Sequence, residues 1–191
     1  QAWYAMNVRT SLQLGKLAID FYYRQTRKDG QPGKFKRLSV RRHEAPAVRE
    51  PEDMEILQLL LGNQPQNDAR YPSYYYGSSY YDSEGYSQSI VAPAMYPLLL
   101  PRLAATGRFV WLLDESMPME EARPIAWDEG PAWRFRLQIR EDEAKRCWSI
   151  DGLLHRDGQT VPLREAVLLL SRGLVLFPDQ LARLEAAEEF P

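Results

Sequence analysis

The residues in this sequence that could perform chemistry are few and far apart. The chain has two histidines, His43 and His155, and one cysteine, Cys147. A zinc site needs several Cys or His ligands at short spacings, and these three residues do not supply them. Cys147 lies beside Trp148 in a predicted strand, where we expect a small buried hydrophobe and not a nucleophile. His155 precedes a turn signal and is expected on the surface.

The acidic residues occur in short runs that coincide with turn signals. Catalytic carboxylates are buried groups with perturbed pKa values, and solvated acids in turns do not meet that requirement. Neither G-x-x-x-x-G-K-[ST] nor G-x-G-x-x-G is present, so no phosphate-binding loop is predicted. We therefore expect no catalytic residue, no metal and no cofactor. A small hydrolase is the least favoured alternative. The acidic runs are Asp114-Glu115, Glu120-Glu121, Asp128-Glu129 and Glu141-Asp142-Glu143.

A basic segment in the N-terminal half is the first candidate binding feature. The whole chain has a net charge of −2, yet between Arg24 and Arg42 the only acid is Asp29. Lys and Arg neutralise phosphates and release counterions, so this segment favours a polyanion such as DNA. The alternative is a solvated sheet face whose charged edge deters aggregation. The candidate nucleic-acid-binding residues are Arg24, Arg27, Lys28, Lys34, Lys36, Arg37, Arg41 and Arg42.

A tyrosine-rich segment, residues 64–91, is the second candidate. It is polar over most of its length and shows neither the period of a strand nor that of a helix. A loop of this length is either functional or disordered. Its rings are suited to stacking on bases or to burial against a partner protein, and the alternative is a flexible or self-packed surface loop. The candidate partner-binding residues are Tyr74, Tyr75, Tyr76, Tyr80 and Tyr81.

The N-terminal half is expected to present the basic segment on a β-hairpin followed by two helices. Residues 16–26 and 34–41 alternate as strands do, and the Gly and Pro residues between them favour a turn. A helix is predicted to begin at Pro51, because Pro and acids suit a first turn, and to end at Gly62. A second helix is predicted over 94–106 despite its two prolines.

Short strands dominate the prediction after residue 107. Turn signals at 128–131, 141–143 and 156–158 separate them. We expect the tryptophans to share one apolar core, with a ligand cage as the alternative; they are Trp111, Trp127, Trp133 and Trp148. The fold class predicted is α+β, with a basic N-terminal hairpin and two helices followed by a mainly antiparallel β meander. The predicted strands are 108–113, 124–127, 132–140, 146–155, 159–163, 166–170, 174–177 and 181–184.

Length and composition fit one compact domain that is a piece of a longer protein. The chain has 191 residues, of which 45% are hydrophobic and 26% charged, as in ordinary globular domains. We divide it into a basic hairpin and helix (1–63), a tyrosine-rich loop (64–91), and a helix with an antiparallel β region (92–191). It begins at Gln1 and continues at once with large apolar residues, as if cut near an element; a processed mature protein is the alternative.

The same features predict a cytoplasmic protein that does not contact a membrane. The apolar runs are far shorter than the roughly 20 residues that cross a bilayer. The first residues lack the basic and apolar regions of a signal peptide. A single cysteine leaves no internal disulfide framework and suits a reducing compartment.

Four sequence stretches carry a resemblance to a known family. They are PLLLPRLAATGRF at 97–109, PIAWDEGPAWRF at 124–135, WSIDGLL at 148–154 and GLVLF at 173–177. Their order resembles the region ahead of the motor in bacterial Swi/Snf-family (DEAD/DEAH-like) helicases. The resemblance covers 97–184 well and 16–61 more loosely, and the tyrosine-rich insert does not belong to the pattern.

In that family the region often follows a SWIM-type zinc finger and precedes two RecA-like ATPase lobes. The resemblance therefore implies a non-catalytic accessory domain of an ATP-dependent DNA translocase. Such a domain positions or regulates the motor, and its partners are the ATPase lobes of the parent chain and DNA. The resemblance carries over no individual site residue. The alternative is a protein-interaction or scaffold module unrelated to nucleic acid.

Overall fold

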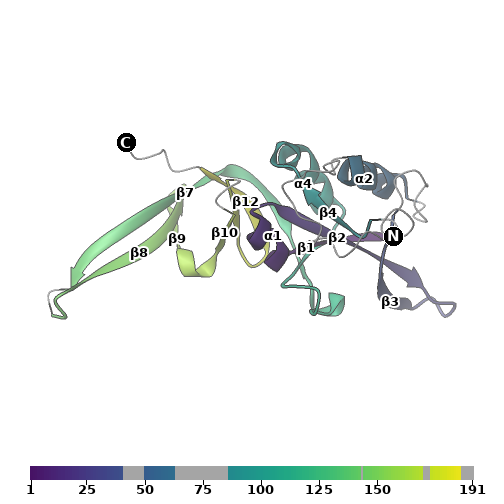
Figure 1. The fold of residues 1–191 in the computed structure, drawn as a ribbon, viewed down its shortest axis with the longest axis horizontal. Helices are drawn as coiled ribbons and strands as arrows, with labels where there is room; N and C mark the ends of the chain where they lie inside the picture. The colour runs from purple at the N-terminus through teal and green to yellow at the C-terminus, as the bar shows by residue number, and fades with distance from the viewer. Residues whose placement is uncertain (41–49, 63–85, 143, 170–172, 186–191) are drawn as a thin grey trace. The chain divides into compact units, whose positions relative to one another are not determined.

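The chain folds into two compact units, which we call unit 1 (Gln1–Pro124) and unit 2 (Ile125–Pro191). The computed structural model describes residues 1–40, 50–62, 86–142, 144–169 and 173–185. In these ranges each unit contains one six-stranded sheet (Figure 1). No helix within them is both long and apolar enough to cross a bilayer.

The sheet of unit 1 has the strand order β3-β2-β1-β5-β6, and β4 pairs with β2. Strand β1 lies parallel to β5, and the other pairs are antiparallel. Apolar residues alternate along β2, so Leu17, Ile19 and Phe21 are fully buried on one face. The strands are β1 (Ala2–Asn7), β2 (Leu17–Thr26), β3 (Pro32–Arg37), β4 (Gln88–Val91), β5 (Phe109–Leu112) and β6 (Arg123–Pro124).

Three α-helices are described in unit 1: α1 (Val8–Leu14), α2 (Pro51–Gly62) and α4 (Tyr96–Ala105). The helices predicted from residue 51 and over 94–106 are thus confirmed. Helix α4 follows a 3₁₀ turn, η1 (Pro93–Met95), and accommodates one proline in its first turn and a second, Pro101, inside it. The buried side chains of α2 and α4 are mostly leucines, which form the apolar stripe of each helix.

Both faces of the unit 1 sheet are covered. On one face the Tyr4 hydroxyl donates to Asp53 of α2, and the Leu17 N–H donates to the Tyr96 hydroxyl of α4. On the other face Ala5, which alternates with Tyr4, packs with Met119. Met119 belongs to the segment between β5 and β6, which contains the short helix η2 (Met119–Glu121). The sheet is therefore an internal layer.

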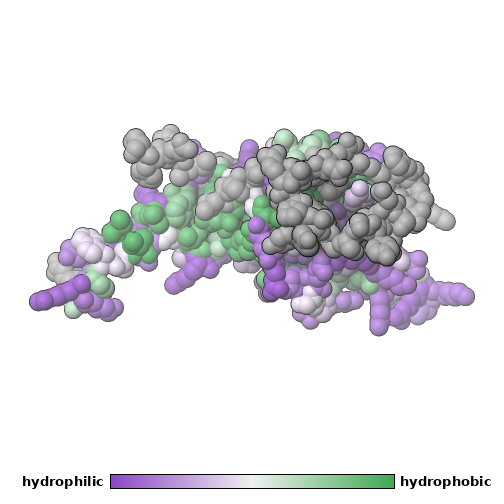
Figure 2. All heavy atoms as spheres, in the orientation of Figure 1, coloured by the Kyte–Doolittle hydropathy of each residue, from purple (hydrophilic) through white to green (hydrophobic). Residues whose placement is uncertain are grey.

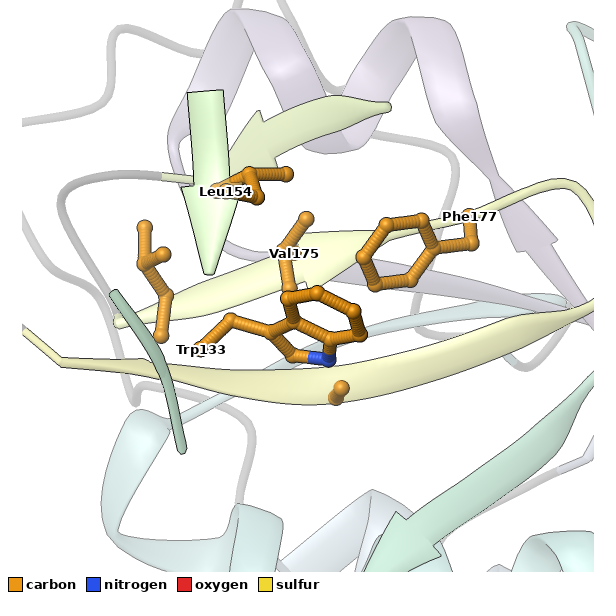
Figure 3. Packing of buried hydrophobic residues seen from close by; sticks show 6 residues of the cluster. Trp133, Leu154, Val175 and Phe177 are labelled. Carbon is orange, nitrogen blue, oxygen red and sulfur yellow. The ribbon is translucent and has the colours of Figure 1, made fainter. Parts of the chain in front are cut away.

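The sheet of unit 2 has the order β10-β11-β12-β7-β8-β9. Strand β12 lies parallel to β7, and the other pairs are antiparallel. Its core contains Trp133, Leu154, Val175 and Phe177 (Figure 3). The elements are β7 (Ala126–Asp142), β8 (Cys147–Arg156), β9 (Gln159–Pro162), η3 (Leu163–Glu165), β10 (Val167–Leu169), β11 (Leu174–Leu176) and β12 (Gln180–Glu185).

The predicted α+β class is confirmed, but the prediction of a single antiparallel meander is wrong. There are two mixed sheets, and a parallel pair in each joins segments that are distant in sequence. Local alternation does not reveal such pairs. The turn predicted at 128–131 lies inside β7, and β4 forms at the end of the predicted tyrosine-rich loop.

Two predictions about burial are also wrong. The four predicted tryptophans do not share a core: Trp133 is buried in unit 2, Trp148 is exposed, and Trp111 lies in unit 1. Cys147 is exposed and not a buried hydrophobe. The exposure of Cys147 and Trp148 has one cause, because the end of β8 that carries them pairs only with β7 among the described strands.

Candidate functional site

The basic segment forms the predicted hairpin, β2–β3, which is confirmed by its antiparallel pairing. In the connecting turn the Arg27 N–H donates to the Gln31 carbonyl, and the Gln31 N–H donates to the Asp29 carboxylate. Gly30 has a φ of +79°, in the left-handed region that glycine adopts without steric cost. The turn is therefore held by its own hydrogen bonds.

Four cations of the hairpin point to solvent. Lys34 and Lys36 are exposed on β3 and alternate with Phe35, so the two ammonium groups lie on the same face of the hairpin. Arg27 and Lys28 are exposed in the turn. None of the four forms an ion pair with another residue in the described ranges. Figure 2 shows hydrophilic residues over this part of unit 1.

Arg24 stiffens the hairpin internally. Its Nε donates to the Gly33 carbonyl at 2.7 Å, and its guanidinium carbon lies 4.7 Å from the centre of the Phe35 ring. Phe35 in turn packs edge-on against Trp3 at 5.1 Å. These contacts fix β3 against β2 and β1, so Arg24 is a positioning residue of the hairpin.

Arg37 is engaged with a buried carboxylate. Its guanidinium donates to Asp20 at 2.9 Å and lies 3.6 Å from Glu115. Asp20 is fully buried and also accepts hydrogen bonds from Gln88 at 2.6 Å and Asn7 at 3.2 Å. Burial raises the pKa of the Asp20 carboxyl, and the Arg37 charge opposes that shift. This cluster is satisfied within unit 1, which is typical of a structural network.

A second buried carboxylate, Asp53, ties α2 to β1. It accepts from the Ala2 N–H at 2.9 Å, the Tyr4 hydroxyl at 3.0 Å and the Arg108 guanidinium at 2.5 Å. Burial raises the pKa of the Tyr4 hydroxyl, and the negative charge of Asp53 raises it further. Each oxygen of Asp53 accepts a hydrogen bond from a residue of unit 1, so the cluster contributes to stability.

The sheet of unit 2 bears a concave region of about 760 Å³. The strand registers place Glu185, Arg134, His155 and Thr160 in one row across β12, β7, β8 and β9. Arg134 pairs with Glu185 at 2.5 Å, and His155 Nδ1 lies 2.8 Å from the Thr160 hydroxyl. His155 Nε2 is buried with no hydrogen-bond partner among the described residues. The Thr160 hydroxyl is therefore the hydrogen-bonding neighbour of the His155 ring among the described residues.

A charged contact closes one side of this concave region. Arg156 pairs with Asp128, and its guanidinium carbon lies 4.4 Å from the centre of the Trp133 ring. Burial acts to raise the pKa of Asp128, but hydrogen bonds from Arg156 and the Gly130 N–H, together with the Arg156 charge, lower it overall. Asp128 is thus held as an anion at a strand position that the sequence suggested was a turn.

The predicted site residues therefore divide into three groups. Arg27, Lys28, Lys34 and Lys36 are brought together on one exposed hairpin, whereas Arg24 and Arg37 make intramolecular contacts. The remaining candidates lie outside the described residues: Arg41, Arg42, Tyr74, Tyr75, Tyr76, Tyr80 and Tyr81.

Sequence reasoning missed an exposed apolar surface on the β7–β8 hairpin. Leu137, Ile139, Trp148 and Ile150 are each more than half exposed there. Their alternation predicted the strands correctly. The missing information was which side chains of the described strands lie against this part of the sheet, because strand alternation does not show it.

The described residues contain no group of three or more His, Cys, Asp or Glu side chains that could hold a metal ion. In comparisons with known proteins, no family model, no curated protein and no solved structure matches the chain. The candidate site is therefore defined by its geometry and charge.

Proposed function

We propose that this chain is a non-catalytic accessory domain of a bacterial Swi/Snf-type DNA-dependent ATPase, and that its β2–β3 hairpin contacts the DNA backbone. The observation that carries the proposal is the group of exposed cations, Arg27, Lys28, Lys34 and Lys36, without ion-pair partners in the described ranges. The resemblance over residues 97–184 supplies the ATPase context, in which the motor belongs to other parts of the parent chain.

The hairpin suits contacts with phosphates more than reading of bases. Lys34 and Lys36 are two residues apart on one strand, so their Cα atoms lie about 6.7 Å from each other along the strand. Lys presents a point charge, which attracts phosphate without selecting a base sequence. Arg24 is held against Phe35 and keeps the hairpin stiff. The expected role is to position the parent motor on DNA.

The test is binding of the full chain to fluorescent duplex and single-stranded DNA over a series of salt concentrations. Four phosphate contacts give a slope of log K against log salt of about −3.6 on duplex. Changing Arg27, Lys28, Lys34 and Lys36 together to Glu is expected to abolish binding. Absence of binding by the unmodified chain at low salt would overturn the proposal.

A matched pair of double variants localises the contact. Arg27→Glu with Lys28→Glu changes the turn of β2–β3, and the slope is expected to become shallower by about 1.8. Lys145→Glu with Arg146→Glu makes the same charge change in the exposed turn of β7–β8 and is expected to leave the slope unchanged. Equal effects of the two variants would show that only the net charge matters and would contradict a contact at the hairpin.

A second candidate function, a protein-interaction module, is favoured by the exposed apolar side chains of β7–β8. An apolar interface responds weakly to salt, whereas phosphate contacts respond steeply. The salt series on any complex of this chain therefore separates the two functions.

A further inference from the structure

The concave region of unit 2 lies on the face of its sheet that is turned away from the core. Trp133 of β7 and Leu154 of β8 belong to the core, so Arg134 and His155, which follow them, lie on the other face. We call the lining residues that share this face the polar floor. They are Glu185 of β12, Arg134 and Arg136 of β7, His155 of β8 and Thr160 of β9.

The concave region has the size and the mixed lining of a small-molecule site. Its volume is about 760 Å³, and sites for small organic molecules measure roughly 300–1,000 Å³. Such sites combine apolar lining with a few polar groups that orient the ligand. Here Pro131 and Ala132 add apolar surface next to the polar floor. Ala132 precedes Arg134 by two residues in β7, so the apolar and basic parts of the lining follow one another along this strand.

Two arginines of the polar floor are suited to a carboxylate. Arg134 donates to the Glu185 carboxylate through Nε, which leaves its terminal nitrogens as further donors. Arg136 is exposed and forms no ion pair within the described part of the chain. The two residues are two positions apart on β7, so their Cα atoms lie about 6.7 Å from each other. A carboxylate between them can therefore accept from both guanidinium groups.

His155 offers a further donor on the same row. Its Nδ1 lies 2.8 Å from the Thr160 hydroxyl, which fixes the orientation of the ring. Its Nε2 is buried and has no hydrogen-bond partner among the residues that the structure describes. Buried polar groups normally have such a partner, because leaving one unpaired is unfavourable. When the Thr160 hydroxyl donates to Nδ1, Nε2 carries the proton of the neutral ring and can donate to an anion.

The charges of the lining favour a ligand with one negative charge. Arg134 is paired with Glu185, and Arg156 is paired with Asp128. Arg136 is thus the cation of the lining that has no acidic partner in the described ranges. Asp157, in the exposed turn between β8 and β9, also lines the region and disfavours a doubly charged phosphate.

We propose that the concave region of unit 2 binds a small organic molecule that carries one carboxylate. The carboxylate accepts hydrogen bonds from Arg134 and Arg136, and His155 Nε2 gains from it the partner that it lacks. The apolar body of the ligand lies against Pro131 and Ala132. Arg134 can turn from Glu185 to the ligand at little cost, because both side chains are more than half exposed and exposed ion pairs are weak.

The first test uses the two histidines of the full chain as reporters in ¹H–¹⁵N spectra, with His43→Gln to assign the signals. Benzoate is expected to shift the ring signals of His155 saturably, with a Kd of about 1 mM. Benzylamine and benzyl alcohol carry the same ring without the negative charge. They are expected to bind at least about 10-fold more weakly, because they cannot accept from two arginines.

A matched pair of variants localises the site. Arg136→Gln removes the unpaired cation and is expected to weaken benzoate binding by about 10- to 100-fold. Arg140→Gln removes the same charge from the same face of β7, four residues further on and outside the lining, and is expected to leave the affinity unchanged. Both arginines are exposed, so circular dichroism should show the sheet retained in each variant.

Three results would overturn the proposal. The first is no shift of the His155 ring signals at about 20 mM benzoate, well above the Kd expected for a ligand of this size. The second is an equal loss of affinity in Arg136→Gln and Arg140→Gln, which would indicate attraction by net charge alone. The third is tighter binding of inorganic phosphate than of benzoate. None of these measurements involves DNA or the β2–β3 hairpin, so they do not bear on the proposed function.

Discussion

The sheets of units 1 and 2 have the same number of described strands but differ in what lies against them. Unit 1 is covered on both faces and encloses charged groups, each paired inside the unit. Unit 2 has an apolar core, and its longest hairpin carries apolar side chains into solvent. The buried polar residues of the described chain are Asn7, Ser11, Asp20, Asp53 and Ser89, all in unit 1.

The two units therefore differ in whether their polar and apolar side chains are already engaged within the unit. In unit 1 Asp20 and Asp53 have their hydrogen-bonding capacity used internally, so they offer nothing to a ligand. Among the described residues of unit 1, the exposed cations of β2–β3 without ion-pair partners are the candidates for binding a ligand. In unit 2 the described β7–β8 hairpin leaves large apolar side chains exposed, which is typical of a surface that other proteins contact.

The largest expected effect comes from Asp53→Ala. This change removes the partner of Arg108 and of the Tyr4 hydroxyl in a buried network. We expect a loss of about 3–5 kcal/mol in the free energy of unfolding. Urea unfolding measures it, and hydrogen exchange of peptides assigns it to unit 1. A loss below about 1 kcal/mol would mean that unit 1 does not depend on its buried charge.

The next effect concerns Gly152 of β8, which lies against Leu163 of η3. Gly152→Ala places a Cβ against Leu163 and is expected to destabilise unit 2 by about 1–3 kcal/mol, as overpacking does. Leu163→Ala in the same chain relieves the clash, so the double variant is expected to be less destabilised than the sum of the two single variants. Simple additivity would contradict a contact between Gly152 and Leu163.

A pH series should affect the two units in opposite directions. Burial raises the pKa of Asp20, so its contribution to unit 1 is fully present below about pH 3.8 and is lost as pH rises through the folded-state pKa. The pKa of Asp128 is lowered, so its contribution to unit 2 is present above about pH 3.8 and is lost as pH falls through the folded-state pKa.

Asparagine variants isolate these two contributions. Relative to the unmodified chain, Asp20→Asn is expected to gain stability as pH rises, and Asp128→Asn is expected to recover its deficit as pH falls. Urea unfolding between pH 3 and pH 7 measures both differences. For each variant, the stability difference from the unmodified chain is followed against pH. If this difference changed with pH in the same direction for both variants, the contrast between the units would be contradicted.

The smallest effect is expected at Cys147. Cys147 is exposed at the start of β8, so Cys147→Ser should change stability by less than about 0.5 kcal/mol. A thiol reagent should modify the folded chain readily. Protection of Cys147 in the folded chain would contradict its exposure on the β7–β8 hairpin.

Much of the secondary structure followed from local pattern. The alternation of residues 16–26, the Pro and acids that open α2, and the Gly-containing turns predicted these elements because their causes are local. A turn was wrongly predicted at 128–131, because Asp and Gly are typical of turns. In the structure the segment lies inside β7, where the register with β12 shifts between Ala182 and Leu184, and Arg156, distant in sequence, pairs with Asp128.

The candidate site was predictable only in part. The charge of β2–β3 is visible in the sequence, but the capture of Arg37 by Asp20 depends on strand register. The exposure of Ile139 and Trp148 depends on how far along the β7–β8 hairpin Leu163 reaches, and Leu163 contacts it at Gly152. These contacts and exposures depend on tertiary packing, and the secondary-structure propensities of the residues carry no information about it.

The parallel pairs β1–β5 and β7–β12 have a consequence for the order in which the chain is made. β1 pairs with β2 as soon as the first 26 residues are free, but its parallel neighbour β5 is synthesised only after both long helices. Closing such distant contacts is slow. During synthesis on the ribosome, the edge of β1 that pairs with β5 therefore lacks that partner for most of the synthesis of unit 1. β7 likewise has no parallel partner until β12 has been synthesised. The sheet of unit 2 is therefore completed by the last strand that the structure describes.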